Sequence, residues 1–128
     1  MRLLLDTHTL VWWTLSPRKL SRCARTAIED ADATVFVSAI SALEIATKVR
    51  LGRFEDARPL ASQFAGQMAL EGFDMLNMTA DHAERAGNLI ITHKDPWDRL
   101  LIAQAQIEQL TLVTKDAKLN KFGAVTLW

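Results

Sequence analysis

Short apolar runs alternate with segments of helical periodicity along this chain. Runs of strand length that end in polar or turn residues occur at residues 2–6, 34–37, 111–114 and 125–128, with a short strand or turn expected at 75–78. The segments between them predict helices over residues 7–15, 21–31, 59–71 and 79–91, one from Ser38 or Ser41 to Gly52, and one that begins at residues 95–96. Strands therefore alternate with helices along the whole sequence.

This alternation, without a hairpin signal such as Asn-Gly, favours an α/β fold. We expect a three-layer sandwich in which helices flank a short, mostly parallel sheet. At 128 residues, the chain is expected to form one domain over residues 1–128. In such sheets the ligand crevice lies beyond the carboxyl ends of the strands, at a topological switch point. Residues that directly follow strands are therefore the first candidates for function.

The densest signal is the stretch HKDPWDRLLIAQA at residues 93–105. Asp95 is predicted to be an N-cap, Pro96 the first helical residue and Asp98 the third. The apolar residues that follow predict a largely buried helix. On this stretch alone, capping that complements the helix dipole is the favoured explanation of both acids, and other acids nearby would favour a site instead.

Two further acids follow predicted strands. Asp6 ends the first strand, and Asp116 lies two residues beyond the strand that ends at Thr114. Carboxylates 5 Å apart repel by about 3 kcal/mol per pair at an effective dielectric constant near 20, so a pocket shared by several acids needs a divalent cation. Ligation by oxygen alone favours Mg²⁺ or Mn²⁺ over zinc.

Glu44 has two interpretations. If the helix begins at Ser41, Glu44 completes a capping box. If Ser38 is the N-cap, Glu44 lies one turn further into the helix, where an acid gains nothing as a cap. The second interpretation makes Glu44 a candidate member of the same acidic site.

The net charge of the chain says little about its partners, but the distribution of charged residues along the sequence is informative. The chain has fifteen Asp and Glu against fifteen Lys and Arg, for a formal net charge of zero. If Asp6, Glu44, Asp98 and Asp116 are set aside as a site, fifteen basic residues remain against eleven acids, a net charge of +4. Basic residues cluster near residues 18–25 and 115–121. These clusters are either solvated faces or a basic rim around an acidic centre, which suits a phosphodiester substrate.

The sequence gives little support for a histidine metal site, a nucleotide-binding loop, a disulfide or a membrane span. His8, His82 and His93 lack metal-ligand spacing and are expected to be structural, no glycine-rich loop follows the first strand, and one cysteine excludes an internal disulfide. No apolar stretch approaches the roughly 18 residues of a membrane span, so we expect a cytoplasmic protein. Trp12 and Trp13 cannot both point inward from one helix, so one is expected to face a groove or a partner.

With these residues in place, the sequence resembles the PIN-domain ribonucleases, and among them the VapC-like toxins of prokaryotic toxin–antitoxin pairs. Four blocks carry the resemblance in the family's order and span the chain: LLLDTHTLVWW at 3–13, SAISALEIATK at 38–48, HKDPWDRLLIAQA at 93–105 and LVTKDAKLNKFGAVTLW at 112–128. The departures, at Leu43, Trp97 and residues 122–123, leave the acids intact.

The resemblance implies roles for particular residues. The implied catalytic quartet consists of Asp6, Glu44, Asp98 and Asp116. Within it, Asp6, Asp98 and Asp116 would bind Mg²⁺, with Mn²⁺ able to substitute, and Glu44 would assist directly or through water. Thr7 and Thr114 are implied as polar supports, and Asp95 mainly as the helix cap.

The implied function is a Mg²⁺-dependent endoribonuclease toxin that cleaves RNA by metal-activated water. A cognate antitoxin and a homodimer are implied with it. We expect the antitoxin to occupy an apolar groove between the helix at 7–15 and the helix that carries Glu44, where Ile45, Val49 and Leu51 follow, and to direct an arginine at the acids. The main alternative is a PIN-like module that binds RNA or protein without cutting. A phosphoacceptor receiver domain fits less well, because the first strand lacks a following pair of acids.

Overall fold

The computed structural model describes residues 1–93 and 95–128, so Lys94, within the block at 93–105, lies outside the described residues. Five strands form one sheet in the order β3-β2-β1-β4-β5, and every pairing is parallel. The strands are β1 (Arg2–Leu5), β2 (Thr34–Ser38), β3 (Asp74–Leu76), β4 (Thr111–Val113) and β5 (Thr126–Leu127). The predicted α/β class and parallel sheet are confirmed.

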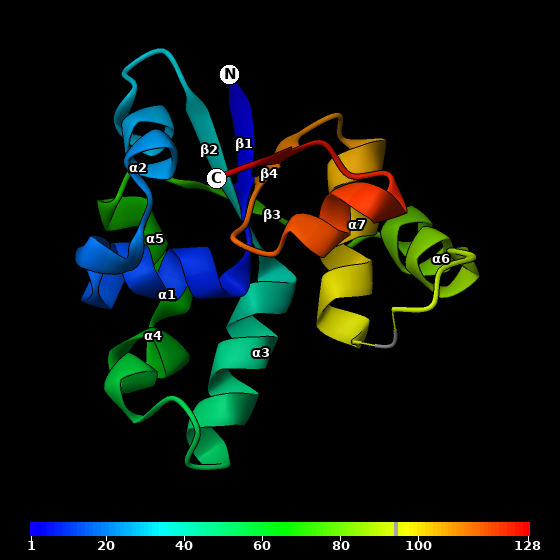
Figure 1. The fold of residues 1–128 in the computed structure, drawn as a ribbon. Helices are drawn as coiled ribbons and strands as arrows, with labels where there is room; N and C mark the ends of the chain where they lie inside the picture. Colours follow the sequence, from blue (N-terminus) through cyan, green and yellow to red (C-terminus); the bar gives the residue numbers. More distant parts are fainter. Residues whose placement is uncertain (94) are drawn as a thin grey trace.

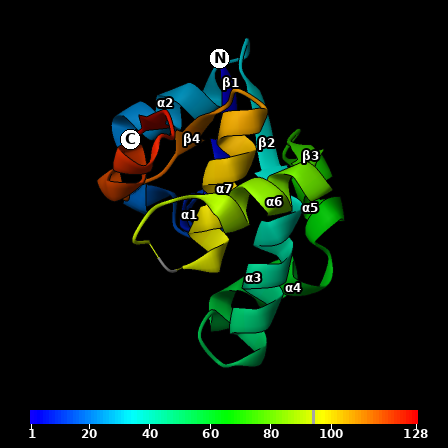
Figure 2. The same ribbon diagram turned by 90° about the vertical axis from the view of Figure 1, so that its right-hand side faces the viewer.

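Helices connect the strands and cover both faces of the sheet (Figure 1). The α-helices are α1 (Thr7–Leu15), α2 (Arg22–Glu29), α3 (Ala39–Arg50), α4 (Arg58–Ser62), α5 (Phe64–Leu70), α6 (Ala80–Asn88) and α7 (Pro96–Ile107). Three 3₁₀ helices complete the set: η1 (Pro17–Lys19), η2 (Glu55–Ala57) and η3 (Ala117–Phe122). Helices α1, α2, α4 and α5 lie on one side of the sheet, and α6 and α7 on the other (Figures 1 and 2).

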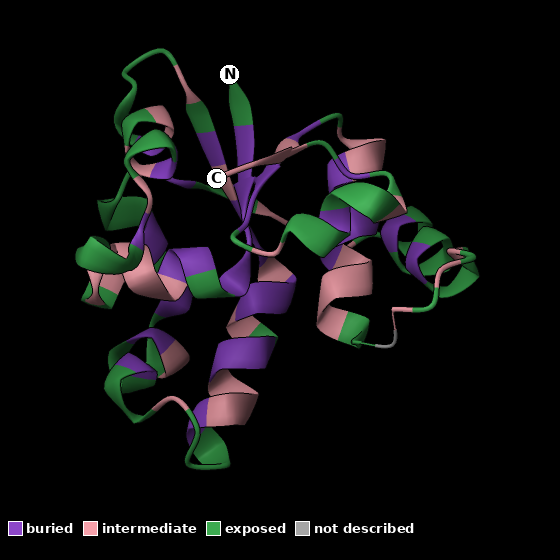
Figure 3. Cartoon of the chain, in the orientation of Figure 1, coloured by how far each residue is buried: buried purple, intermediate pink, exposed green. Residues whose placement is uncertain are grey.

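Strand β1 shows why the sheet is covered on both faces. Leu3 and Leu5 point into the core beneath α1 and α2, whereas Leu4 points into the core beneath α7. All three side chains are fully buried, because successive residues of a strand face opposite sides of the sheet (Figure 3). A continuous apolar run is therefore what a central parallel strand requires.

The switch in strand order lies beside β1. The chain builds β2 and β3 on one side of β1, then crosses back through α6 and α7 to place β4 on the other side. Asp6 directly follows β1, and its backbone N–H donates to the carbonyl of Val113 at the end of β4, at 3.1 Å. The crevice expected at a switch point therefore opens between the ends of β1 and β4.

Two helix predictions were wrong in extent. The helix expected over 59–71 is broken at Gln63 (φ −141°), which separates α4 from α5. Leu60 before the break and Phe64 and Met68 after it are all buried in the same core, so their packing outweighs the local preference for one continuous helix. The helix expected over 79–91 ends at Asn88.

The remaining boundaries agree more closely. The strand or turn expected at 75–78 is β3, and the strand expected at 125–128 is the two-residue β5. The helix expected at 21–31 is α2, capped by Ser21, whose hydroxyl accepts the N–H of Ala24 at 3.0 Å. Among the described residues, no helix is long and apolar enough to cross a membrane.

Candidate functional site

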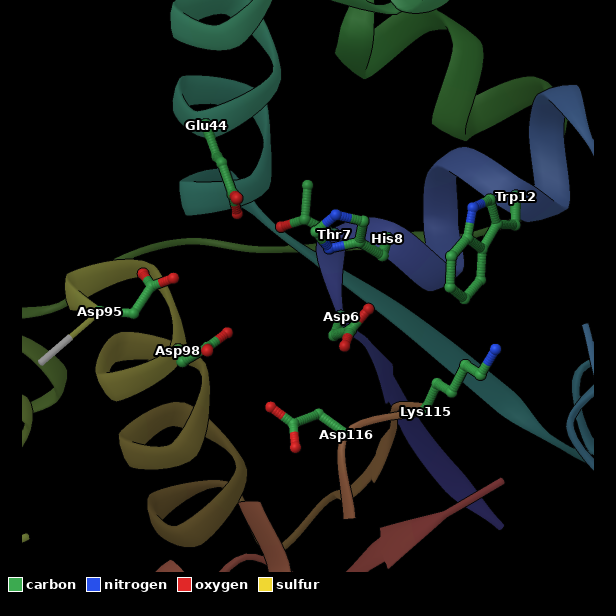
Figure 4. Close-up of a pocket in the computed structure, with 9 residues that line it drawn as sticks. All are labelled: Asp6, Thr7, His8, Trp12, Glu44, Asp95, Asp98, Lys115 and Asp116. Carbon is green, nitrogen blue, oxygen red and sulfur yellow. The ribbon is translucent and has the colours of Figure 1, made fainter. Parts of the chain in front are cut away.

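A pocket of about 330 Å³ lies at the carboxyl edge of the sheet, and all four predicted acids line it (Figure 4). Asp6 comes from the junction of β1 and α1, Glu44 from α3, Asp98 from α7, and Asp116 from the segment that follows β4. The other lining residues are Thr7, His8, Trp12, Asp95 and Lys115. The fold thus brings together acids that are up to 110 positions apart in the sequence.

Asp6 is the most constrained of the four acids. It is the N-cap of α1, and its Oδ1 accepts the backbone N–H of Thr9 at 2.8 Å. Its Oδ2 accepts the hydroxyl of Thr114, and the side chain is buried. Each carboxylate oxygen can accept more than one hydrogen bond, so both retain a lone pair for a further partner.

Glu44 is buried one turn inside α3. The N-cap of this helix is Ser38, whose Oγ accepts the N–H of Ile40 at 3.0 Å, so the capping box from Ser41 is not formed. The Ser41 hydroxyl instead lies 2.9 Å from that of Thr7. Glu44 therefore has no capping role, and its carboxylate points into the pocket (Figure 4).

Lys48 accompanies Glu44 one helical turn further on. Its Nζ lies 2.5 Å from Oε2 of Glu44 and 5.1 Å from the ring centroid of Phe54. The ammonium group offsets one of the negative charges of the pocket. The spacing of Glu44 and Lys48 is the ordinary i, i+4 spacing of helical ion pairs. The sequence therefore carries a signal for this partner of Glu44, although the pattern of acids at strand ends does not include it.

Asp98 is half-buried and bonded to His93. The Nε2 of His93 lies 2.7 Å from Oδ2 of Asp98. Burial raises the pKa of the Asp98 carboxyl group above its ordinary value, the hydrogen bond from His93 lowers it, and the nearby carboxylates of Asp95 and Asp6 raise it. The pKa of Asp98 is raised overall, so the pocket disfavours the ionised form of this carboxyl group.

Asp116 begins η3. Its Oδ1 accepts the N–H of Lys118 at 3.0 Å, and its own N–H donates to Oγ1 of Thr114 at 3.1 Å. Thr114 therefore contacts Asp6 through its hydrogen and the backbone of Asp116 through its oxygen. Thr114 thus fixes the positions of Asp6 and Asp116 relative to each other at the end of β4.

Helix starts surround the pocket. Asp6, Asp95 and Asp116 are the N-caps of α1, α7 and η3, and Asp95 accepts the N–H of Trp97 at 2.9 Å, as predicted. The amide groups at a helix N-terminus favour negative charge. They therefore reduce the repulsion among the acids, so the capping interpretation and the site interpretation apply to the same residues.

The donor set suits a hydrated Mg²⁺ ion. All four acids offer oxygen, and Glu44, Asp98 and Asp116 each have one carboxylate oxygen with no hydrogen bond among the described residues. Within residues 1–93 and 95–128, no three Asp, Glu, His or Cys side chains are close enough to hold an ion together. Mg²⁺ usually keeps several waters and binds one or two carboxylates directly. Acids that are too far apart to bind the ion together can therefore hold a hydrated Mg²⁺ through its waters.

The mouth of the pocket is aromatic and basic. Lys115 Nζ lies 5.8 Å from the centroid of the Trp12 ring, which also packs against Trp128 and the exposed His8. Trp13 instead packs on the core and donates from Nε1 to Oε2 of Glu71 at 2.9 Å. Trp12 is therefore the member of the pair that faces a cavity.

A second pocket of about 320 Å³ adjoins the first and shares His8 and Trp12 with it. Its walls come from α1 and from residues 53–57. The expectation that Ile45 and Val49 line a groove is wrong, because both are buried in the core. Leu51 is exposed but does not line this pocket.

These features define a parallel α/β protein with an acidic pocket at the switch point of its sheet. Residues 3–125 match the PIN domain family, and the chain belongs to that family. The chain is 36% identical over 129 residues to Ribonuclease VapC22 of Mycobacterium tuberculosis, which covers 98% of this chain and 97% of the relative. The resemblance expected from the four sequence blocks is therefore confirmed.

Solved structures share the fold. A toxin–antitoxin complex from Klebsiella pneumoniae matches with a TM-score of 0.68 and 24% identity, covering 98% of this chain and 96% of that one. VapBC2 from Rickettsia felis, bound to a DNA fragment from its promoter, matches with a TM-score of 0.67 and 18% identity, covering 99% and 98%.

Proposed function

We propose that this chain is a divalent-cation-dependent endoribonuclease and the toxin of a toxin–antitoxin pair. The observation that carries the proposal is the convergence of four acids from separate segments on one pocket. Membership of the PIN domain family and 36% identity to a protein named as a ribonuclease support the same reaction.

We infer that Asp6, Asp98 and Asp116 bind Mg²⁺, for which Mn²⁺ substitutes, one or two of them directly and the rest through its waters, and that Glu44 assists directly or through water. When bound, the cation supplies positive charge beside the phosphodiester and lowers the pKa of water. Thr114 supports Asp6 through the hydrogen bond to Oδ2. Thr7 lines the pocket and is bonded to Ser41 of α3, so it ties the start of α1 to the helix that carries Glu44.

The rim supplies the contacts that RNA requires. Lys115 is exposed at the mouth, where its ammonium group meets phosphate charge. Trp12 offers an aromatic surface beside it, on which an unpaired base stacks. The acidic interior and the basic mouth thus perform different tasks: the first holds the cation and the second the RNA strand.

The experiment that tests this function is RNA cleavage by the purified chain under metal control. We expect total RNA to be cut in Mg²⁺ or Mn²⁺ and to stay intact in EDTA. Asp6→Asn removes a ligand and is expected to abolish cleavage, whereas Asp32→Asn, at an exposed turn far from the pocket, is the matched control. RNA that is bound but never cut in either metal would establish the non-catalytic module instead.

We also infer a cognate antitoxin as partner, because solved structures of the same fold include toxin–antitoxin complexes. We place an antitoxin segment in the second pocket, beside Trp12 and Phe54, with an arginine directed at Asp6 and Asp98. Such an arginine would compete with the cation. The homodimer and the cytoplasmic location implied by the resemblance belong to the same proposal.

A further inference from the structure

Arg99 binds the end of α6 and the segment that follows it, residues 89–93. Its Nε donates to the carbonyl of Ala86 at 3.0 Å and its Nη1 to that of His93 at 3.1 Å. Its Nη2 donates to the carbonyls of Leu89 at 2.7 Å and Gly87 at 3.3 Å. A single guanidinium group thus satisfies carbonyls that the end of α6 leaves without helical partners. The path of the segment is therefore fixed to α7.

His93 lies at the far end of residues 89–93, beside Asp98 of the acidic pocket. Its backbone carbonyl is bound by Arg99, and its ring packs against Phe122 with 5.3 Å between ring centroids. The first contact fixes the backbone of His93, and the second packs against its ring. From this position its Nε2–H donates to Oδ2 of Asp98 at 2.7 Å.

Asp98 needs such a partner. Its side chain is 26% exposed, so burial alone does not fix its orientation. Rotation about its side-chain bonds would turn the carboxylate away from the pocket. The hydrogen bond from His93 engages one carboxylate oxygen and leaves the other facing the pocket (Figure 4).

We propose that His93 and Arg99 are positioning residues for Asp98. Arg99 fixes the segment at residues 89–93, the segment fixes His93, and His93 holds the Asp98 carboxylate in the orientation that receives a cation. Partners that orient a metal-binding side chain in this way typically change metal affinity by 10- to 100-fold when removed. The inference rests on the proposed function, because it needs a cation at the acidic pocket.

The test is direct Mn²⁺ binding by the complete chain without RNA, followed by electron paramagnetic resonance. His93→Phe keeps a ring against Phe122 but removes the donor, and is expected to weaken Mn²⁺ binding by about tenfold. His93→Gln restores an N–H donor and is expected to recover part of the affinity. Arg99→Met is expected to weaken binding to a similar degree, because it acts through His93.

Two controls separate positioning from general stability. Arg85→Met removes a guanidinium group on α6 whose Nη1 contacts Gln106 at 3.3 Å, and is expected to leave Mn²⁺ affinity unchanged. The double variant His93→Phe with Arg99→Met is expected to bind no more weakly than either single variant, since both remove the same hydrogen bond. Hydrogen exchange of residues 89–93 in the metal-free protein is expected to quicken in Arg99→Met and not in Arg85→Met.

Each of the following results would overturn one part of the proposal. Equal Mn²⁺ affinity in wild type and His93→Phe would reject His93 as a positioning residue, with the nuclease proposal intact. A lower Tm with unchanged Mn²⁺ affinity in Arg99→Met would make Arg99 a purely structural anchor. If Arg99→Met does not fold, Arg99→Lys, which keeps the charge without the planar fork, takes its place. A wild-type chain that binds no Mn²⁺ would reject the metal site and the inference together.

Discussion

The hydroxyl of Thr114 donates a hydrogen bond to Oδ2 of Asp6, joining residues 108 positions apart at the ends of β4 and β1. These strands are neighbours in the sheet and lie at its switch point. The contact links the topology of the fold to the orientation of the first acid in the pocket.

Thr114→Val tests this link. The change keeps the shape of the side chain but removes two hydrogen bonds, to Asp6 and from the N–H of Asp116, and is expected to lower the free energy of unfolding by about 1 kcal/mol for each. It is also expected to weaken Mn²⁺ binding, because Asp6 loses the donor that orients it. Thr9→Val is the matched control, since it removes the 2.9 Å hydrogen bond from Oγ1 to the Val113 carbonyl without changing a side-chain contact of an acid. Calorimetry of both variants checks the prediction, which fails if both affect Mn²⁺ equally.

Asp98→Asn and Asp95→Asn separate a cation ligand from a helix cap. Asn caps helices as well as Asp, so both variants are expected to fold. Asp98→Asn is expected to abolish RNA cleavage while leaving the fold intact or more stable, because it removes a repulsive charge and a ligand together. Asp95→Asn is expected to retain cleavage. Comparable loss of activity in the two variants would assign Asp95 to the cation as well.

The pH dependence of stability follows from the raised pKa of Asp98. The folded protein retains a proton on this carboxyl group over a pH range in which the unfolded chain, with an ordinary value of 3.8, has released it. The free energy of unfolding therefore falls as pH rises from 3.8 through the folded pKa. We expect Asp98→Asn to lack this component, so that the stability of the variant relative to wild type increases across that range. Thermal melts of the metal-free proteins at several pH values measure it, and parallel curves would show that Asp98 contributes nothing.

Antitoxin binding and Mg²⁺ are expected to be antagonistic if an arginine enters the acidic pocket. The affinity of the antitoxin, measured by calorimetry, should fall as Mg²⁺ is added, and hydrogen exchange should show protection at residues 8–16 and 53–57. The occlusion model is rejected if protection is confined to distant residues and affinity is indifferent to Mg²⁺, even where the nuclease assignment stands.

Most of the fold could be predicted from the sequence because local signals agreed with the tertiary structure. The fully apolar run at Leu3–Leu5 fits a central strand with two buried faces, and Asp95 with Pro96 forms the predicted start of α7. The predicted strands place Asp6 and Asp116 at one edge of the sheet, whereas the full quartet with Glu44 and Asp98 comes from the resemblance; all four line one pocket. Where two local signals competed, as for Ser38 and Ser41 at the start of α3, only the packed structure decided between them.

The contacts of the site that the sequence did not reveal are hydrogen bonds whose partners no local sequence pattern indicates. Nothing local to Arg99 indicates that it binds four backbone carbonyls, yet those bonds accompany the early end of α6 and the position of His93. The sequence predicts only a structural role for His93, because the histidines lack metal-ligand spacing and His93 lies just before a helix. The contact between His93 and Asp98 depends on the position of residues 89–93, which Arg99 binds.

The chemical nature of the RNA ends tests the central claim most directly. If the acidic pocket activates water with a bound cation, the water attacks phosphorus and the products carry 5′-phosphate and 3′-hydroxyl ends. A histidine-driven mechanism through His8 or His93 would use the ribose 2′-hydroxyl and leave 2′,3′-cyclic phosphate with 5′-hydroxyl ends. Ligation-based sequencing of untreated products, which captures only 5′-phosphate ends, distinguishes the two. We predict efficient capture in Mg²⁺ and none from Asp6→Asn. Products captured only after phosphorylation of their 5′ ends would contradict the acidic pocket as the catalytic site.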